Sequence, residues 1–465
     1  MGGAVGSSNF PTLHELSSIL SASPPDCAES VRPTSVCIDS RTCAPGALFC
    51  ALPGEQTDGH HYVVSAAQAG ACGAIVRDHI SPSGDPWPIP VLVVPDALQA
   101  LHEVAAWYAT HHLSGNTTRI GVTGSNGKTT TKEMIAAILR DVDSCFVSTG
   151  NLNSETGLPL SVCETPPGVR YAVYELAMSR PGEIAPLARI VRPHHAVITH
   201  IGTAHIGNLG SQQAIAAEKK QITAYFTGAE TLYIPEDDDF RDVLAAEVAG
   251  AVVTTGPVTQ HASLETDPTD HRVIVRIGSR SATLPILGRH NGRNALIALA
   301  VTQKLGIDTD SALASLTRVV LPSGRSQRIE QNGHTIIHDA YNANPGSMIA
   351  SIEMAEELGV TVLILGDMYE LGVFEEAGHR EVIQAALASS ARLICFVGER
   401  FRAVLSEAPE APPMDRVLSA PTVSEIAELV RPRLQPGETI LLKGSRAVAL
   451  EHVIGSFAEG GEIRA

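Results

Sequence analysis

The chain has 465 residues, 44% of them hydrophobic, which is enough for several globular domains with sizeable cores. Aromatic residues make up only 4%, which disfavours recognition of nucleic acid by base stacking, and the formal net charge of −17 would repel nucleic acids and anionic membranes. We therefore expect no nucleic-acid partner and no membrane insertion, since no apolar run approaches the length of a membrane span.

The cysteines and the N-terminus bear on the cellular compartment. None of the eight cysteines forms a CxxC pair, which disfavours a zinc site, and a chain of this length needs no disulfide scaffold. Residues 1–9 are small and polar and lack the basic start and apolar core of a signal peptide. Reduced thiols and a cytoplasmic location are the expectation.

Three blocks follow one another along the chain, and we expect an α/β fold with three domains. Residues 1–112 have the short apolar runs and turn dipeptides of a small mixed α/β domain. Residues 113–318 alternate apolar strands with helical segments, which predicts a parallel sheet. Strands of this sheet are expected at 120–123, 171–176 and 195–201, each ending at polar residues, where open α/β sheets bind ligands.

The third block, residues 319–465, repeats the alternation after a hinge-like sequence at 322–325. Its strands are expected at 361–365, 393–397 and 439–442. The pattern is Rossmann-like, but no G-x-G-x-x-G follows any of these strands, so the block has no dinucleotide-binding fingerprint.

The most informative motif opens the second block, where an apolar strand runs into Thr123-Gly124-Ser125-Asn126-Gly127-Lys128-Thr129-Thr130 and then into a helix-forming stretch. We call residues 123–130 the phosphate loop. Glycines let backbone N–H groups approach a polyphosphate, and the helix N-terminus favours negative charge. Lys128 would reach the β- and γ-phosphates and the Thr129 hydroxyl would face Mg²⁺. The loop predicts nucleotide binding, although Val122 stands where the usual spacing places the first glycine.

Several polar residues outside the phosphate loop can be interpreted as either functional or structural. Glu175, at a strand end, could hold Mg²⁺ or be a solvated acid. His205 is one of 18 histidines and could be a metal ligand or a structural residue. Lys219 lies in a Glu-Lys-Lys run that is typical of a solvated helix face.

Three further segments could bind a ligand. Asn291 and Asn294 follow Gly288 at a helix start, where they could bind a ligand or where Asn291 could cap the helix. Asp339-Ala-Tyr-Asn-Ala-Asn-Pro is a polar loop after an apolar run, which indicates binding. Lys443-Gly-Ser-Arg446 could bind a carboxylate or phosphate, or be a surface turn.

Together, these motifs resemble the Mur ligases, the ATP-dependent amide-forming enzymes of peptidoglycan precursor synthesis, over residues 36–453. The TGxxGKTT phosphate loop of that family fits Thr123 to Thr130 without a gap, which explains the departure from the general spacing. The sequences around Asn151, Glu175 and Asn342 are similar to the branch that adds D-alanyl-D-alanine to UDP-N-acetylmuramoyl-tripeptide. The resemblance implies those two substrates as partners, ATP, and two Mg²⁺ sites, and we expect a monomer.

The resemblance also implies a role for each matching residue. Thr129 and Glu175 would bind the first Mg²⁺, and His205 the second. Lys219 would be carbamylated and bind metal, which replaces the interpretation of the Glu-Lys-Lys run as a solvated helix face. The catalytic residues would be Lys128, Lys219 and His205. ATP would contact residues 123–130, Asn291, Asn294, Arg325 and Asp339. The substrates would contact Ser40, Arg41, Asp58, His60, Asn151, Asn153, Asn342, Asn344, Lys443, Ser445 and Arg446.

The sequence departs from the family pattern at two positions, and other functions are possible alternatives. Ala177 replaces a common glycine and Gly207 a common glutamate, but neither change removes a proposed ligand. The alternatives are a Mur ligase that adds the third residue, a folylpolyglutamate synthase, and a nucleotide-binding regulatory module without ligase activity. The Tyr341-Asn-Ala-Asn-Pro sequence argues against the first two, and the set of Glu175, His205 and Lys219 argues against the third.

Overall fold

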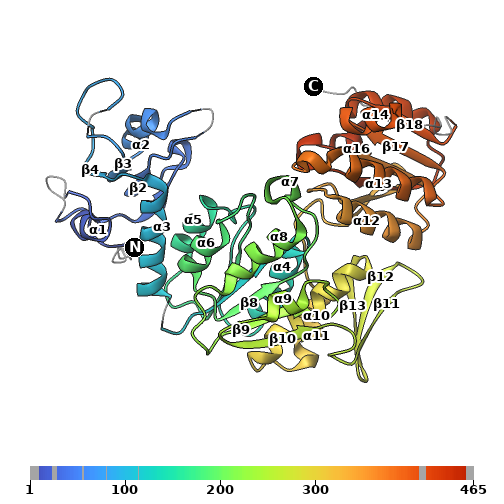
Figure 1. The fold of residues 1–465 in the computed structure, drawn as a ribbon, viewed down its shortest axis with the longest axis horizontal. Coiled ribbons are helices and arrows are strands. Elements are labelled where there is room, and N and C mark those ends of the chain that lie inside the picture. The colour runs from blue at the N-terminus through green and yellow to red at the C-terminus, as the bar shows by residue number, and fades with distance from the viewer. Residues whose placement is uncertain are drawn as a thin grey trace, which may run out of the picture.

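The structure, a computed structural model, describes residues 10–23, 29–54, 57–79, 81–113, 115–407 and 415–456. Figure 1 shows an N-terminal part in blue and a C-terminal part in orange and red on either side of a green and yellow central part. Three of the four sheets are wholly or mainly parallel, which confirms the predicted α/β fold with three domains. None of the described helices is both long and apolar enough to cross a membrane.

The N-terminal part is built on a parallel sheet of strand order β1-β2-β3-β4. Its long helix, α3 (Ala97–His112), starts where Asp96 accepts hydrogen bonds from the backbone of Leu98 and Gln99. This helix packs on its own sheet and on two helices of the central part, so it joins the two domains. The other elements are α1 Leu13–Ile19, β1 Ser35–Cys37, η1 Ser40–Thr42, β2 Ala47–Cys50, η2 Gly59–Tyr62, α2 Val63–Gln68, β3 Gly73–Val76 and β4 Val91–Val93.

The central part has a six-stranded parallel sheet of order β10-β9-β8-β5-β7-β6. Strand β5 lies between β7 and β8, so the phosphate loop that follows it lies where the direction of strand addition reverses, the usual ligand site of such sheets. The strands are β5 Thr118–Thr123, β6 Cys145–Val147, β7 Tyr171–Glu175, β8 His195–Ile198, β9 Thr231–Pro235 and β10 Ala251–Thr255.

Helices cover this sheet, and a small antiparallel sheet of order β11-β12-β13, which the sequence pattern did not predict, packs on α10. The helices are α4 Lys128–Arg140, α5 Gly157–Glu164, α6 Ile184–Val191, α7 Ile206–Leu209, α8 Gln212–Lys220, η3 Gln221–Thr223, α9 Arg241–Ala245, α10 Arg289–Lys304 and α11 Thr309–Leu316. The added strands are β11 Ala262–Thr266, β12 Arg272–Ile277 and β13 Arg280–Leu287.

The C-terminal part has a sheet of order β14-β15-β19-β16-β17-β18, parallel except for the β14–β15 hairpin. The strands are β14 Gln327–Gln331, β15 His334–His338, β16 Val362–Gly366, β17 Leu393–Val397, β18 Val417–Ala420 and β19 Thr439–Lys443. The helices are α12 Pro345–Glu357, η4 Gly372–Phe374, α13 Glu375–Ala388, α14 Glu399–Ser406, α15 Val423–Val430, η5 Arg431–Arg433, η6 Arg446–Val448 and α16 His452–Ser456.

The predicted strands agree with the observed ones to within two residues at every end except one. Strand β8 ends at Ile198, three residues before the predicted end at 201. The chain leaves the sheet there because the Thr199 hydroxyl turns back to the phosphate loop and donates to the backbone carbonyls of Thr123 (3.2 Å) and Asn126 (2.5 Å).

Candidate active site

The phosphate loop is held in one shape by its neighbours. Gly124 has a φ of 146° and a side chain there would overlap the Thr199 hydroxyl, so only glycine fits. Gly127, with a φ of 80°, is the N-cap of α4. The Lys128 ammonium curls back over the loop and donates to the carbonyls of Gly124 (2.8 Å) and Ser125 (3.3 Å). Burial lowers the pKa of Lys128.

Glu175 is buried at the end of β7 and is not the solvated acid of the alternative reading. Its Oε2 accepts a hydrogen bond from the Thr129 hydroxyl at 2.7 Å, and its Oε1 accepts one from Asn153 Nδ2 at 2.8 Å. The same Thr129 oxygen accepts a hydrogen bond from Arg325 Nη2 at 2.8 Å. The structure therefore brings together four of the predicted site residues, which come from four separate segments of the chain.

His205 lies just beyond β8, in the left-handed conformation with a φ of 61°. Its Nδ1 lies 2.6 Å from Glu370 Oε2, and this contact lowers the pKa of Glu370. Glu370 belongs to the C-terminal domain, and its carbonyl also accepts from the Gly207 amide at 3.3 Å. Nothing local in the sequence places Glu370 beside His205, so the sequence alone predicts no role for Glu370.

Lys219 is buried, with 1% of its surface exposed, so the solvated helix face predicted from the charge run is wrong at this position. Burial, together with the nearby positive charge of Lys128, lowers the pKa of the Lys219 amine well below its ordinary value. Within the described residues its Nζ has no hydrogen bond or ion pair. The preceding Glu218 instead accepts from the backbone amides of Gly182 and Ile184, both at 2.9 Å, and thereby ties α8 to the start of α6.

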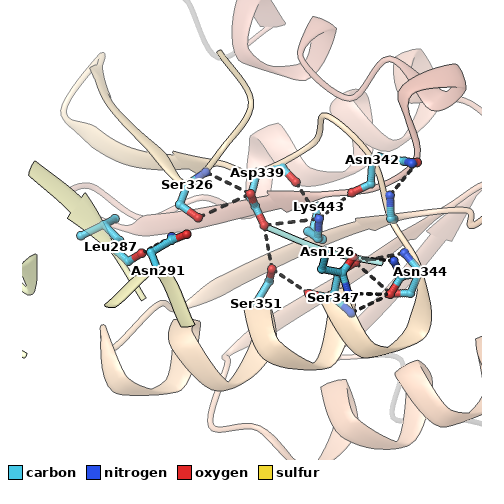
Figure 2. A network of polar contacts seen from close by, with 11 residues as sticks. Asn126, Leu287, Asn291, Ser326, Asp339, Asn342, Asn344, Ser347, Ser351 and Lys443 are labelled. Atoms are coloured by element: carbon cyan, nitrogen blue, oxygen red, sulfur yellow. Dashed lines mark hydrogen bonds and ion pairs between the residues drawn. The ribbon is translucent and has the colours of Figure 1, made fainter. Parts of the chain in front are cut away.

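The loop after β15 reaches the phosphate loop directly (Figure 2). The side-chain amides of Asn344 and Asn126 face each other, with Asn344 Nδ2 donating to Asn126 Oδ1 at 2.7 Å. Asn344 is also the N-cap of α12, where its Oδ1 accepts from the Ser347 amide at 3.0 Å. The predicted substrate residue Asn344 is thus occupied by protein partners.

The buried Lys443 and the partly buried Asp339 form an ion pair beside this loop, with Lys443 Nζ 3.3 Å from Asp339 Oδ2 (Figure 2). Lys443 also donates to the Asn342 carbonyl at 2.6 Å, so the surface-turn reading of this segment is wrong at Lys443. Burial raises the pKa of Asp339, but Lys443 and a hydrogen bond from the Ser351 hydroxyl outweigh it and leave the pKa lowered.

Asn291 and Asn294 lie one above the other in the first turns of α10. Asn291 Nδ2 donates to the Leu287 carbonyl at 2.8 Å and Asn294 Nδ2 donates to Asn291 Oδ1 at 3.2 Å. The helix has Gly288 as its N-cap, with no capping side chain, so the alternative that Asn291 caps it is wrong. A Cβ on Gly127 would lie 2.6 Å from Asn294 Oδ1, which places Asn294 against the phosphate loop.

The predicted residues of the N-terminal domain form a separate set. Asp58 Oδ1 lies 2.5 Å from His60 Nδ1, and Asp58 Oδ2 lies 2.8 Å from Arg77 Nη2. His60 is buried and its Nε2 accepts from the Arg77 amide at 2.9 Å, so both ring nitrogens have protein partners. Ser40 and the exposed Arg41 lie in η1, where Arg41 pairs with Asp39 at 2.7 Å.

A cavity of about 830 Å³ is lined by predicted site residues of both the central and the C-terminal domains. Lys219 and the four predicted residues of the N-terminal domain do not line this cavity. Ser445 and Arg446 do not line it either: Ser445 accepts a hydrogen bond from the Tyr369 amide, and Arg446 pairs with Glu451. The Arg325 guanidinium lies 4.2 Å from the ring centre of Tyr341, a contact that the sequence did not predict. Predicted residues on the wall are 125–130, Asn151, Asn153, Glu175, His205, Asn291, Asn294, Arg325, Asp339, Asn342, Asn344 and Lys443.

Family comparison agrees with this arrangement of domains. Three family models match in chain order: "Mur ligase family, catalytic domain" over residues 33–108, "Mur ligase middle domain" over 122–302, and "Mur ligase, glutamate ligase domain" over 324–446. The chain belongs to the Mur ligase family.

Relatives in this family match over almost their whole length. The chain is 35% identical to the UDP-N-acetylmuramoyl-tripeptide–D-alanyl-D-alanine ligase of Treponema pallidum, over 90% of this chain and 92% of that protein. It is 33% identical to the enzyme of the same name from Bacillus subtilis, over 91% of this chain and 93% of that protein.

Solved structures of family members have the same fold. A crystal structure of MurF from Acinetobacter baumannii superposes with a TM-score of 0.85 at 28% identity, covering 96% of this chain and 98% of that one. MurF from Thermotoga maritima, crystallised with ADP, superposes with a TM-score of 0.78 at 27% identity, covering 91% and 96%.

Proposed function

We propose that the chain is an ATP-dependent ligase that joins D-alanyl-D-alanine to UDP-N-acetylmuramoyl-tripeptide, with release of ADP and phosphate, in peptidoglycan precursor synthesis. The relatives with this name, at 30–35% identity over about nine-tenths of the chain, support the substrate pair. The single observation that carries the proposal is the shared cavity, because one wall is the phosphate loop and the other is the Asp339-to-Asn344 loop. We further propose that the protein acts in the cytoplasm as a monomer, with domains at 1–112, 113–318 and 319–465.

The chemistry requires activation of a carboxylate. At neutral pH a peptide carboxylate and an ammonium group are both in unreactive ionised forms. Transfer of the γ-phosphoryl group of ATP to the carboxylate gives an acyl phosphate, whose phosphate is a good leaving group. The free amine of D-alanyl-D-alanine then attacks the acyl carbon, and the tetrahedral intermediate collapses to amide and phosphate. No protein nucleophile is needed, so positioning and electrostatics supply the rate enhancement.

A buried guanidinium nitrogen on the cavity wall indicates that the cavity suits an anion. Within the described residues, Arg325 Nε is buried and lacks a hydrogen-bond partner. Unsatisfied buried groups are costly, so they indicate a ligand-binding site. We propose that residues 123–130 bind the ATP phosphates, that Asn291 and Asn294 lie at the adenine, and that Arg325 and Asp339 reach ATP from the C-terminal side.

The acidic residues suit Mg²⁺ only if a phosphate supplies further oxygens. The described chain has no cluster of three metal-binding side chains, but Mg²⁺ is usually held by one or two carboxylates together with substrate phosphates. We propose that Glu175 and the Thr129 hydroxyl hold the first Mg²⁺ and that His205 holds a second. Mg²⁺ would offset the repulsion between the two anions that meet in phosphoryl transfer, as would the ammonium of Lys128.

Lys219 fits a carbamate better than a permanent cation. Carbon dioxide adds to a neutral amine, and burial favours that form of Lys219. The product is a carboxylate on a buried stem, which could serve as a metal ligand. We propose that Lys219 is carbamylated.

The remaining polar residues are proposed to bind the substrates. Ser40, Arg41, Asp58 and His60 would lie at the uridine end, with His60 acting through Asp58 and Arg77. Asn151 and Asn153 would face the muramoyl peptide. Asn342, Asn344, Lys443, Ser445 and Arg446 would shape the site on the C-terminal side.

One assay tests the proposal. Purified protein with ATP, Mg²⁺ and UDP-N-acetylmuramoyl-tripeptide should release ADP at a high rate only when D-alanyl-D-alanine is added. Ligation of glutamate or a diamino acid to the matching acceptor instead would place the chain in another branch. ATP binding without acceptor-dependent ADP release would indicate a regulatory module.

A further inference from the structure

Two thiols of the N-terminal domain lie in contact. Cys37 ends strand β1 and Cys43 follows the short helix η1, and their sulfur atoms are 2.8 Å apart. A disulfide needs two cysteines whose backbones already approach and whose side chains face each other. Cys37 and Cys43 meet the second condition, and a short rearrangement of the intervening turn would bring the sulfurs to bonding distance.

The other described thiols of this domain are directed elsewhere. Cys50 is buried, and its thiol donates to the Ala97 carbonyl at 3.3 Å. The Cys72 thiol donates to the Gly46 carbonyl at 3.2 Å. Among the residues that the structure describes, Cys37 and Cys43 make the one thiol–thiol hydrogen bond. The thiol–thiol hydrogen bond is therefore specific to this pair, while Cys50 lies near Cys37 and Cys72 lies near Cys43.

We propose that Cys37 and Cys43 are a modification site, at which a hydroperoxide such as hydrogen peroxide forms a reversible disulfide. Cys43 is only partly buried and reacts first. Its thiolate attacks one peroxide oxygen, so that an S–O bond forms as the O–O bond breaks, and the departing hydroxide takes up a proton to become water. Cys43 is then a sulfenic acid.

The buried Cys37 completes the reaction as the resolving thiol. Its sulfur attacks the Cys43 sulfur, so that an S–S bond forms as the S–O bond breaks, and the departing hydroxide takes the Cys37 proton to give a second water. The two thiols lose two electrons in total and the peroxide gains them. Burial raises the pKa of Cys37, in keeping with its acting second.

The disulfide would close a small ring around a turn with a proposed substrate role. The ring from Cys37 to Cys43 contains all of η1, Ser40–Thr42, whose start is held by the hydrogen bond from the Arg41 amide to Asp39 Oδ1 at 2.9 Å. We expect the bond to shift this turn, because both of its flanking cysteines are drawn together. The consequence rests on the proposed function, in which Ser40 and Arg41 lie at the uridine end: oxidation should raise the KM for the UDP-linked acceptor several-fold and leave the KM for ATP unchanged.

Peptide mapping tests the disulfide independently of activity. The full chain is treated with hydrogen peroxide, alkylated, digested with trypsin and analysed by mass spectrometry. Because trypsin cuts after Arg41, the disulfide should appear as two peptides joined through Cys37 and Cys43, and dithiothreitol should separate them. Cys43→Ser should abolish the joined species and Cys50→Ser should retain it. Absence of the Cys37–Cys43 link, or a link from Cys43 to Cys72, would overturn the proposal.

Kinetics then test the consequence. Oxidised wild type should show the raised KM for the acceptor, and peroxide-treated Cys43→Ser should not. A disulfide that forms without changing this KM contradicts the effect on the acceptor. Inactivity of the reduced, untreated protein would contradict the proposed function and leave the mapped disulfide standing.

Discussion

The side chains of Asn126 and Asn344 form a two-way amide pair between the phosphate loop and the C-terminal domain (Figure 2). Asn344 Nδ2 donates to Asn126 Oδ1 at 2.7 Å, and Asn126 Nδ2 donates to Asn344 Oδ1 at 3.4 Å. Because Asn344 also caps α12, the position of that helix is linked directly to the loop proposed to hold the phosphates.

Asn344→Ala should therefore lower kcat and raise the KM for ATP. Loss of one or two hydrogen bonds, each worth about 1 kcal/mol, corresponds to about a fivefold to thirtyfold loss in kcat/KM. Ser347→Ala is the matched control, since it removes the capping partner of Asn344 and leaves the pair with Asn126 intact. Steady-state kinetics of Asn126→Ala, of Asn344→Ala and of the double variant Asn126→Ala/Asn344→Ala measure the coupling. Fully additive losses would show that the pair has no joint role.

Lys128→Ala should abolish phosphate release in the presence of both substrates, because its ammonium lies over the phosphate loop. Thermal unfolding should show that the variant remains folded. Lys304→Ala, at the exposed end of α10, is the control and should keep full activity. Near-normal turnover of Lys128→Ala would mean that residues 123–130 do not serve the reaction.

Lys219→Ala should lose most activity, and a small added carboxylic acid should restore part of it by occupying the space of the carbamate. Direct mass spectrometry can miss a labile carbamate, so rescue is the better measurement. Lys220→Ala, the adjacent and less buried lysine, should be nearly neutral. Unimpaired turnover of Lys219→Ala would rule out the carbamate as a required ligand.

Gly207→Ala should disturb the contact between the central and C-terminal domains. A Cβ at Gly207 would lie 2.5 Å from the Gly372 nitrogen and 2.6 Å from the Leu371 carbonyl carbon, and both are backbone atoms that cannot move aside locally. Small-angle scattering with an ATP analogue should show a more open molecule, and kcat should fall. Gly455→Ala, where a Cβ meets no atom within 4 Å, is the control. A compact, fully active Gly207→Ala would show that this contact is dispensable.

Asp238 should make folding stability depend on pH. Burial raises its pKa, but hydrogen bonds from His200 and from the Ile201 and Phe240 amides outweigh this and leave the pKa lowered. A lowered folded-state pKa means that the stabilisation is present above the unfolded value, about pH 4, and is lost as the pH falls further. Asp238→Asn should cost about 1–3 kcal/mol at neutral pH, measured by urea unfolding. The difference from wild type should shrink in acid; a constant difference would contradict the assignment.

Much of the fold could be read from local patterns. The apolar runs that became β5, β7, β16 and β17 are buried on both faces, and such runs are recognisable without knowledge of the fold. The antiparallel β11–β13 sheet was missed because its strands alternate buried and exposed residues in short segments.

The phosphate loop could be recognised from the sequence alone, because its glycines, lysine and threonines lie within eight consecutive residues. Its shape also depends on Thr199 and Asn294, which pack against it from elsewhere in the chain. The surroundings of the other residues were decided by tertiary structure. The charge run around Lys219 predicts a solvated cation, but the packing of α8 buries this side chain. No role for Glu370 could be predicted, because only the packing of the C-terminal domain places it beside His205. The charge state and the partners of a side chain depend on its burial and on residues that are distant in the sequence. Both arise only when distant segments pack together, so residue type and spacing alone do not determine them.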